Sequence, residues 1–172
     1  MRVLNVFARG LDHPVVRGLV VGLLATAAAS GGAAQEKFAF RGLSRDTTLE
    51  DLRTRYPESS ISGRHLHVSE KDSHDHIYGI SIPESDPAAP LILLFEKRGP
   101  RAATYPRCET VLGSLEKQYG EPARVQEFDE ERARNRRFIW WRGGEALSLL
   151  CFRLGRPHFS AAELTISLRE KP

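Results

Sequence analysis

The chain has 172 residues, of which 41% are hydrophobic and 27% charged, and its formal net charge at pH 7 is +3. Arg2, Arg9, Arg17 and Asp12 lie in the first 34 residues; without that segment the 25 basic and 22 acidic residues become 22 and 21, a net charge of +1. This near-neutral balance argues against nucleic acid as a partner, and about 138 residues suffice for one domain with a buried core.

The first 34 residues have the three parts of a secretory signal peptide. A basic lead-in precedes a short apolar core at residues 18–29, and residues 30–34 are small enough for signal peptidase. We expect cleavage after Ala34, with the alanines at 27–29 as a competing site. A membrane-spanning anchor, the alternative, needs about 20 apolar residues, more than this core offers.

The predicted cleavage site also bears on where the protein is found. No cysteine lies near it to carry a lipid, so we expect no stable membrane anchor after cleavage. We therefore predict that residues 35–172 form a single exported α+β domain, periplasmic or secreted.

The first half of this domain predicts one helix among strands. Residues 38–40 alternate and predict a short strand, and Thr47 stands three residues before Glu50, a capping-box pattern that predicts the start of a helix that Pro57 ends. Further strands are predicted at residues 60–69, 74–82 and 91–97, with a proline-rich loop at 85–90. Because residues 91–95 form a continuous apolar run, we expect the last of these strands to be central and covered on both faces or nearly so.

The clearest element is a helix at residues 108–119. Its apolar positions recur at the spacing of one helical face, and Gly120 offers the left-handed residue that ends a helix. Strands at residues 124–128 and 138–142 are predicted to follow, and an alternating, half-buried last strand is predicted at residues 162–168.

A two-residue turn at Gly143 and Gly144 predicts the best-defined hairpin. It sets three residue pairs opposite each other on one face: Trp140 with Leu147, Phe138 with Leu149 and Arg136 with Cys151. The opposite face then carries Ile139, Trp141, Ala146, Ser148 and Leu150.

The order of the elements predicts the fold class. One short strand, a helix, three strands, a second helix and about four strands indicate an α+β fold, an antiparallel sheet with two helices on one face. The first helix is a faint copy of the second, so a duplicated helix-plus-meander unit is one interpretation. The matching positions are Leu49, Leu52, Tyr56 and Pro57 in the first copy and Leu112, Leu115, Tyr119 and Gly120 in the second.

Two cysteines, Cys108 and Cys151, fall in the predicted exported part. In an oxidising compartment an even pair indicates a disulfide, here between the start of the second helix and a late strand. The alternative is a reactive thiol at Cys108, because a helix N-terminus lowers the pKa of a thiol.

Several short motifs occur together. The first helix ends in Tyr56 and Pro57, the second ends in residues 118–122 (QYGEP), and Trp140 precedes a Gly-Gly hairpin. The chain thereby resembles the small exported bacterial domains of the beta-lactamase-inhibitor-like type, and its build is similar to that of small outer-membrane assembly lipoproteins. The resemblance spans most of residues 38–168 and implies a protein-binding or envelope-associated module with no catalytic residues. The chain departs from the lipoprotein branch because it has no lipidation cysteine.

Four histidines, His65, His67, His74 and His76, lie in one short stretch. With a two-residue turn between the pairs, all four imidazoles share one side of a hairpin and suit zinc, copper or nickel. A register shifted by one residue instead turns Leu66 and Val68 to the same face as the apolar residues that follow His76, and it separates the two histidine pairs. Core burial favours the shifted register, so the metal site is the alternative hypothesis and we expect no cofactor.

The segment 129–137 (DEERARNRR) holds three acids followed by four arginines. It could form an anion site, but we favour a solvated hairpin tip whose charges pair locally.

The remaining candidate site is an aromatic patch. Trp140 fits the core, which leaves Trp141, Ile139 and Leu150 on the other face of the sheet, where an exposed patch would anchor a protein interface. The alternative is that the N-terminal strand or a dimer partner covers that face. The sequence has no Gly-x-Ser-x-Gly elbow, no His-Glu-x-x-His, no phosphate-binding glycine loop and no dinucleotide fingerprint. We therefore predict a noncatalytic binding module for a protein or envelope component.

Overall fold

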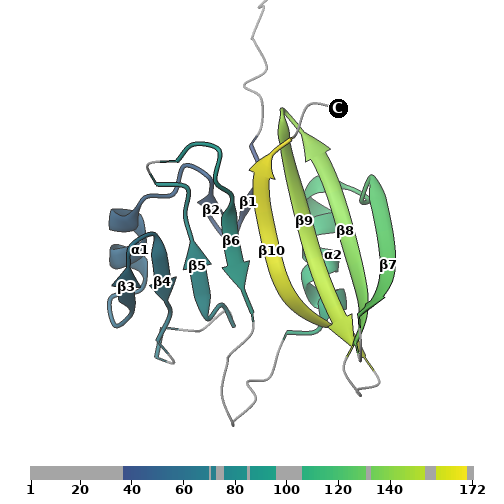
Figure 1. The fold of residues 1–172 in the computed structure, drawn as a ribbon, viewed down its shortest axis with the longest axis horizontal. Helices are drawn as coiled ribbons and strands as arrows, with labels where there is room; N and C mark the ends of the chain where they lie inside the picture. The colour runs from purple at the N-terminus through teal and green to yellow at the C-terminus, as the bar shows by residue number, and fades with distance from the viewer. Residues whose placement is uncertain are drawn as a thin grey trace, which may run out of the picture. The chain divides into compact units, whose positions relative to one another are not determined.

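The computed structural model describes residues 37–69, 71–72, 76–84, 86–95, 106–130, 133–153 and 158–169 (Figure 1). The predicted signal peptide at residues 1–34 lies outside the described residues. The described elements form an α+β fold, as predicted. In chain order they are β1 (Ala39–Phe40), β2 (Leu43–Ser44), α1 (Leu49–Arg55), β3 (Ser60–Ser62), β4 (His65–His67), β5 (Gly79–Ser81), β6 (Leu91–Leu94), α2 (Cys108–Tyr119), β7 (Arg124–Glu130), β8 (Ala133–Arg142), β9 (Glu145–Arg153) and β10 (Ser160–Leu168).

The strands form one large sheet and one small one. Eight strands pair in the order β3-β4-β5-β6-β10-β9-β8-β7, and β1 pairs with β2. All of these pairs are antiparallel. Among the described elements, each helix is followed in the chain by four strands. The sequence predicts only three strands after the first helix. The last strands of the two sets, β6 and β10, lie side by side in the middle of the sheet (Figure 1).

One row of apolar residues crosses the whole sheet, with one member from each strand directly opposite the next. Its inner members are buried in the core, and both helices pack on this face, as predicted, through Leu52 of α1 and Leu115 of α2. Burying each such side chain contributes about 1.5–3 kcal/mol to the stability of the fold. A shift of one residue in any strand would expose its member of the row, so the row also fixes the register of the sheet. The row consists of Ile61, Leu66, Ile80, Leu93, Leu164, Leu149, Phe138 and Val125.

The helix α1 begins one residue later than its capping pattern predicts. The capping box joins Thr48 and Asp51, because Thr47 is engaged in the preceding turn, where its hydroxyl accepts the backbone N–H of Ser44. Asp51 accepts two hydrogen bonds from Thr48, one from its backbone N–H and one from its hydroxyl. Both lower the pKa of the Asp51 carboxyl, the backbone hydrogen bond more strongly.

The disulfide between Cys108 and Cys151 is confirmed, with a Cα–Cα distance of 5.8 Å. It ties the first residue of α2 to the C-terminal part of β9, and both cysteines are buried. The alternative of a reactive thiol at Cys108 is wrong, because its sulfur is bonded to that of Cys151.

Two strand predictions are corrected. Residues 60–69 form two strands, because Gly63 takes a φ of +56° and turns the chain between β3 and β4. The apolar run in β6 is not covered on both faces: Leu91 and Leu93 are buried, whereas Leu94 is 37% exposed. A central antiparallel strand needs cover on one face only.

The hairpin at Gly143 and Gly144 is confirmed in its register, with Trp140 opposite Leu147. The two other predicted pairs are also present, Phe138 with Leu149 and Arg136 with Cys151.

The N-terminal strand is held by two distant side chains. Glu145 accepts the backbone N–H of Phe38 over 2.9 Å, and the hydroxyl of Tyr119 accepts the N–H of Ala39 and donates to its carbonyl. Glu145 also lies 3.9 Å from a guanidinium nitrogen of Arg45, and both side chains are buried. Phe38 packs edge-on against Tyr119, so the strand belongs to the layer that contains α2.

In the part of the chain that the structure describes, no helix combines the length and the apolar character that a membrane crossing needs.

Candidate functional site

The face of the large sheet opposite the helices carries the candidate site, and we call it the open face. In Figure 1, α2 lies behind β8 and β9, so the viewer looks onto the open face. Its residues alternate with those of the buried row, and across β8, β9 and β10 they form three ranks. These are Trp141, Ala146 and Ser167; Ile139, Ser148 and Thr165; and Arg137, Leu150 and Glu163.

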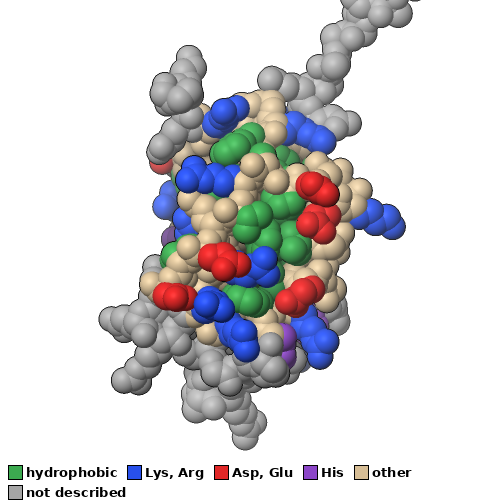
Figure 2. Space-filling model, turned by 90° about the vertical axis from the view of Figure 1, so that its right-hand side faces the viewer, with side chains coloured by type: hydrophobic (Ala, Val, Ile, Leu, Met, Phe, Trp, Pro, Cys, Tyr) green, Lys and Arg blue, Asp and Glu red, His purple; other side chains and the backbone are tan. Residues whose placement is uncertain are grey.

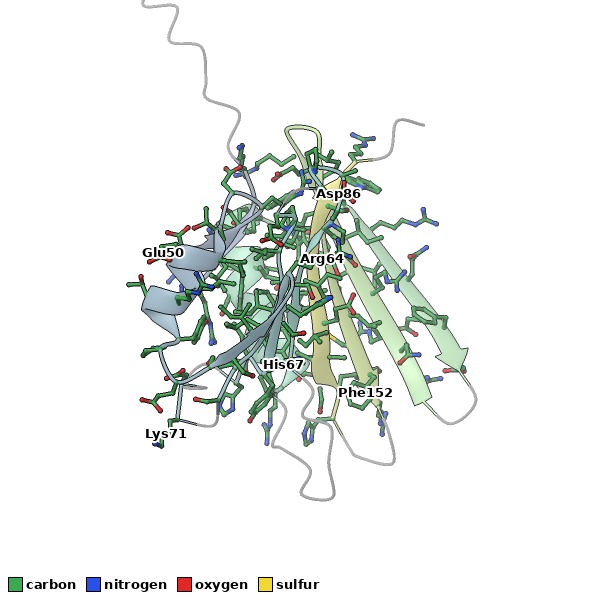
Figure 3. All side chains as sticks on the ribbon, turned by 60° about the vertical axis from the view of Figure 1, so that its left-hand side comes forward. Glu50, Arg64, His67, Lys71, Asp86 and Phe152 are labelled. Carbon is green, nitrogen blue, oxygen red and sulfur yellow. A yellow bond between two sulfur atoms is a disulfide. The ribbon has the colours of Figure 1, made fainter. Side chains whose placement is uncertain are left out.

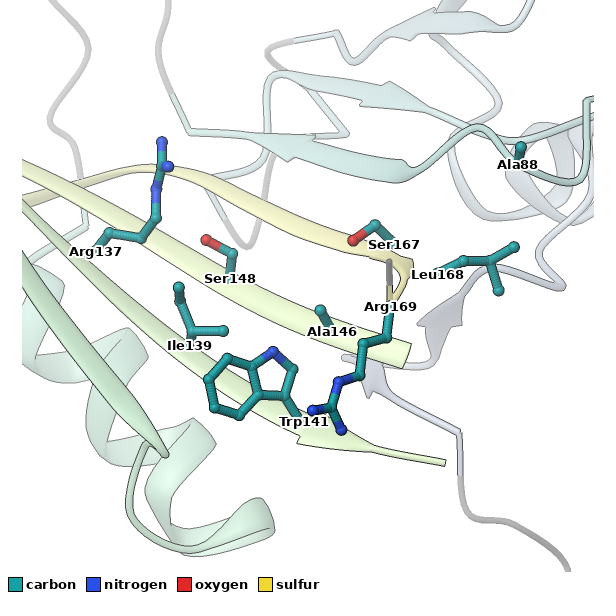
Figure 4. A pocket seen from close by; sticks show the side chains of 9 residues that line it. All are labelled: Ala88, Arg137, Ile139, Trp141, Ala146, Ser148, Ser167, Leu168 and Arg169. Atoms are coloured by element: carbon teal, nitrogen blue, oxygen red, sulfur yellow. The ribbon is translucent and has the colours of Figure 1, made fainter. Parts of the chain in front are cut away.

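A hollow of about 790 Å³ lies in this face beside Trp141 (Figure 4). Its floor consists of the small side chains Ala146, Ser148 and Ser167. In β9, Ala146 and Ser148 lie opposite the large Trp141 and Ile139 of β8, and Ser167 of β10 lies on the other side of Ala146. Arg137, Ile139 and Trp141 border it along β8, while Leu168, Arg169 and Ala88 complete the lining.

The three predicted interface residues all lie on the open face. Trp141 is 41% exposed and Ile139 is half-buried, and both line the hollow. Leu150 is half-buried beside Arg137 and is not part of the lining. The N-terminal strand does not cover this face, because Phe38 and Phe40 pack into the core on the helix side.

Arg169 extends the site beyond what the sequence predicts. Its guanidinium carbon lies 5.3 Å from the centre of the Trp141 ring, a cation–π contact, and its backbone N–H donates to the carbonyl of Gly144. Arg169 follows Glu163, Thr165 and Ser167 at every second position of the last strand, so the sequence indicates which face of the sheet it occupies. The sequence does not indicate that Arg169 lies close to Trp141, because that depends on the pairing of β10 with β9.

The charged segment 129–137 contains local ion pairs, as we favoured. Arg134 lies 3.7 Å from Asp129, and Arg136 lies 3.1 Å from Glu127. Figure 2 shows the side of the molecule that carries β7, where hydrophobic side chains gather at the centre and both acidic and basic groups border them. Arg137 points to the open face and lies over the ring of Phe128.

The histidines of the metal hypothesis are placed in part. His65 and His67 are exposed on the open face of β4; His67 is labelled in Figure 3. His76 is exposed with a φ of +62°. Nδ1 of His65 lies 2.7 Å from the hydroxyl of Ser81. His74 lies outside the described residues, so the alternative hypothesis, in which all four imidazoles converge, stays untested. Among the residues that are described, no group of three or more His, Cys, Asp or Glu side chains could hold a metal ion.

The register of β4 and β5, the strands next to these histidines, places their apolar residues in the core. Leu66 lies opposite Ile80, and His65 and His67 lie opposite Ser81 and Gly79. The argument from burial thus places Leu66 and Ile80 on one face correctly, although the connection between β4 and β5 is longer than a two-residue turn.

The chain matches no protein-family model, and comparison with curated proteins and with solved structures gives no match. The resemblance to beta-lactamase-inhibitor-like domains therefore stays a prediction that rests on short motifs.

Proposed function

We propose that this chain is a noncatalytic binding module, periplasmic or secreted, that holds a protein or envelope partner against its open face. The observation that carries the proposal is Trp141: its indole is 41% exposed beside an open hollow, while the adjacent Trp140 is buried. Aromatic side chains that are accessible next to a hollow are the residues that most often anchor protein interfaces.

The core does not account for Trp141. Both helices cover the other face, where the buried row and Trp140 already supply the packing. The indole of Trp141 exposes apolar surface to water. Burial of that surface by a partner would stabilise the complex by about 25 cal/mol per Å². This difference between the two tryptophans supports a contact role for Trp141.

The chemistry of the hollow supports binding without catalysis. Its described lining consists of arginine, serine, tryptophan and aliphatic side chains. None of these residue types has an ordinary pKa near neutrality, so the lining offers no general acid or base.

Export is supported by two features. The buried disulfide between Cys108 and Cys151 is typical of oxidising compartments, and residues 1–34 have the pattern of a cleaved signal. The order of the elements also supports a duplicated helix-plus-meander unit, because a helix followed by four sequential strands occurs twice and the two sets meet at β6 and β10.

Site-specific crosslinking tests the proposal. A photoreactive phenylalanine analogue replaces Trp141 in one variant and Glu116, which is exposed on α2, in a matched control, and both are produced in cells from the full-length sequence. We expect a protein or envelope component that crosslinks from position 141 and not from position 116. The purified component should then bind Trp141→Ala about tenfold or more weakly than the wild type. Equal crosslinking from both positions would contradict the proposal.

A further inference from the structure

The arginines of the β7–β8 hairpin divide into two groups by the face that they occupy. On the helix side, Arg134 lies directly opposite Asp129 and Arg136 opposite Glu127, and each forms an ion pair. On the open face the cross-strand neighbours carry no carboxylate. There Arg137 lies opposite Gln126, and Arg124 lies opposite Ile139.

Three guanidinium groups therefore lie on or beside the open face without an ion-pair partner among the described residues: Arg124, Arg137 and Arg169. Arg137 and Arg169 line the hollow itself, and each is held over an aromatic ring, at 5.5 Å from Phe128 and 5.3 Å from Trp141. A cation–π contact orients a guanidinium but leaves its charge uncompensated, with N–H donors available at the edge of the plane.

The described residues that line the hollow include no carboxylate. The nearest acid on this face within the same ranks is Glu163, which lies opposite Leu150 and accepts the hydroxyl of Thr165 over 2.7 Å. The hollow thus presents two arginine forks, two serine hydroxyls and the apolar surfaces of Trp141 and Ile139. Planar guanidinium groups bind carboxylates through paired, charge-assisted hydrogen bonds.

The charge of the chain restricts the kind of anion. A polyanion is held through many phosphate contacts, about 6–10 in a nucleic-acid complex, whereas the described residues give this part of the face three arginines around an apolar centre. The predicted exported segment has a net charge of only +1. A protein loop that combines carboxylates with an apolar side chain complements such a mixed surface better.

We infer that the open face binds an acidic loop of a partner protein, with its carboxylates on Arg137 and Arg169 and an apolar side chain between Trp141 and Ile139. This inference rests on the proposed binding function and specifies the chemistry of the partner. Arg124, at the β7 edge, supplies a third positive charge that attracts the loop toward the face.

The test uses NMR titration, which detects weak binding, on isotope-labelled protein produced from the full-length sequence. The probes are two cyclic peptides of equal length, one presenting Glu-Leu-Asp and the other Gln-Leu-Asn. We expect the acidic peptide to shift the Trp141 indole signal and the backbone signals of Ser148 and Ser167. The amide peptide should bind roughly tenfold or more weakly, because charge-assisted hydrogen bonds are lost.

Variants separate the inference from the function on which it rests. The double variant Arg137→Glu and Arg169→Glu should lose the acidic peptide, whereas Arg53→Glu with Lys117→Glu, which makes the same charge change on exposed positions of α1 and α2, should retain it. Matching circular dichroism spectra and unfolding midpoints establish that both variants are folded. Trp141→Ala should weaken both peptides.

Each other outcome overturns the inference in a distinct way. If both peptides bind equally and only Trp141→Ala reduces binding, the open face binds partners but does not select acidic ones. If neither peptide shifts the open face while position 141 still crosslinks a partner, the partner is not an acidic loop. Arginine-dependent binding that is stronger for heparin or for vesicles with anionic headgroups than for the acidic peptide would assign the face to a polyanion or a membrane surface. If position 141 crosslinks nothing beyond the control, the proposed function fails as well.

Discussion

Trp140 joins β8 to the end of α2, because its indole N–H donates to the carbonyl of Gly120 over 2.9 Å. Gly120 is the C-terminal cap of α2, with a φ of +81°. The next residue along β8, Trp141, lies on the opposite face and 41% of it is exposed. Two adjacent residues of the same type thus have separate roles, one in the core and one on the candidate binding surface.

This separation predicts different effects of truncation on stability. Trp140→Ala should lower the free energy of unfolding by about 3–5 kcal/mol, because it leaves a large cavity in the core. Trp141→Ala should lower it by less than about 1 kcal/mol, as is typical of exposed positions. Urea unfolding followed by circular dichroism measures both values. Equal losses in the two variants would show that Trp141 is also part of the core.

The same two residues predict the fluorescence behaviour of the protein. Iodide should quench the emission of Trp141 and leave that of Trp140 nearly unchanged, because iodide reaches only exposed indoles. Trp141→Phe should therefore remove the quenchable component, and Trp140→Phe should keep it.

Glu145 predicts a large effect from a single carboxylate. Glu145→Ala should destabilise the fold by about 2–4 kcal/mol, because the N–H of Phe38 loses its acceptor and the buried Arg45 loses its negative neighbour. Glu145→Gln should cost less, since its side-chain oxygen can still accept from Phe38. The control is Glu116→Ala on the exposed side of α2, which should unfold as the wild type does. Wild-type stability of Glu145→Ala would contradict the role of this contact.

The disulfide predicts a loss of stability on reduction. The bridge closes a loop with a sequence separation of 43, and the double variant Cys108→Ala and Cys151→Ala should be less stable by about 2–4 kcal/mol. Unfolding midpoints measured with and without reductant should differ for the wild type and agree for the double variant. Free thiols detected in denatured, unreduced protein would count against the bridge.

Asp51 predicts a pH-dependent contribution from the helix cap. Its pKa is lowered by the hydrogen bonds from Thr48, so it stabilises the folded state above the ordinary pKa of a carboxyl, and this contribution is lost as pH falls through the lowered value. The difference in unfolding midpoint between the wild type and Asp51→Asn should be greatest near neutrality and vanish in acid. Glu50→Gln serves as the neighbouring control. A difference that is the same at every pH would contradict the linkage.

Local patterns were enough to predict α2, the disulfide and the β8–β9 hairpin. The turn at Gly143 and Gly144 fixes the register of its strands, and the register then decides which face each residue occupies. The positions of Trp140 and Trp141 on opposite faces follow from that turn alone. The start of α1 was predicted one residue too early, because Thr47 and Thr48 both precede an acid by three residues and only the turn from Ser44 distinguishes them.

Long-range pairing could not be predicted in the same way. Nothing local indicates that β6 lies beside β10, since the paired residues are 69 (Leu94 and Glu163) to 75 (Leu91 and Ile166) positions apart in the sequence. The hollow depends on such pairing, because Ser167 forms part of its floor only when β10 lies next to β9. The sequence therefore indicated the face of the candidate site and placed Ala146 and Ser148 on it, but not the position of Ser167 beside them or the proximity of Arg169 to Trp141.

The N-terminal strand bears on the order in which the chain can fold. Phe38 and Ala39, among the first described residues, obtain their partners from Glu145 and Tyr119, at sequence separations of 107 and 80. During synthesis these partners leave the ribosome only after most of the chain has been made, so the first residues cannot complete the core as they appear. The contacts of Phe38 and Ala39 therefore form late, once α2 and β9 have both been synthesised.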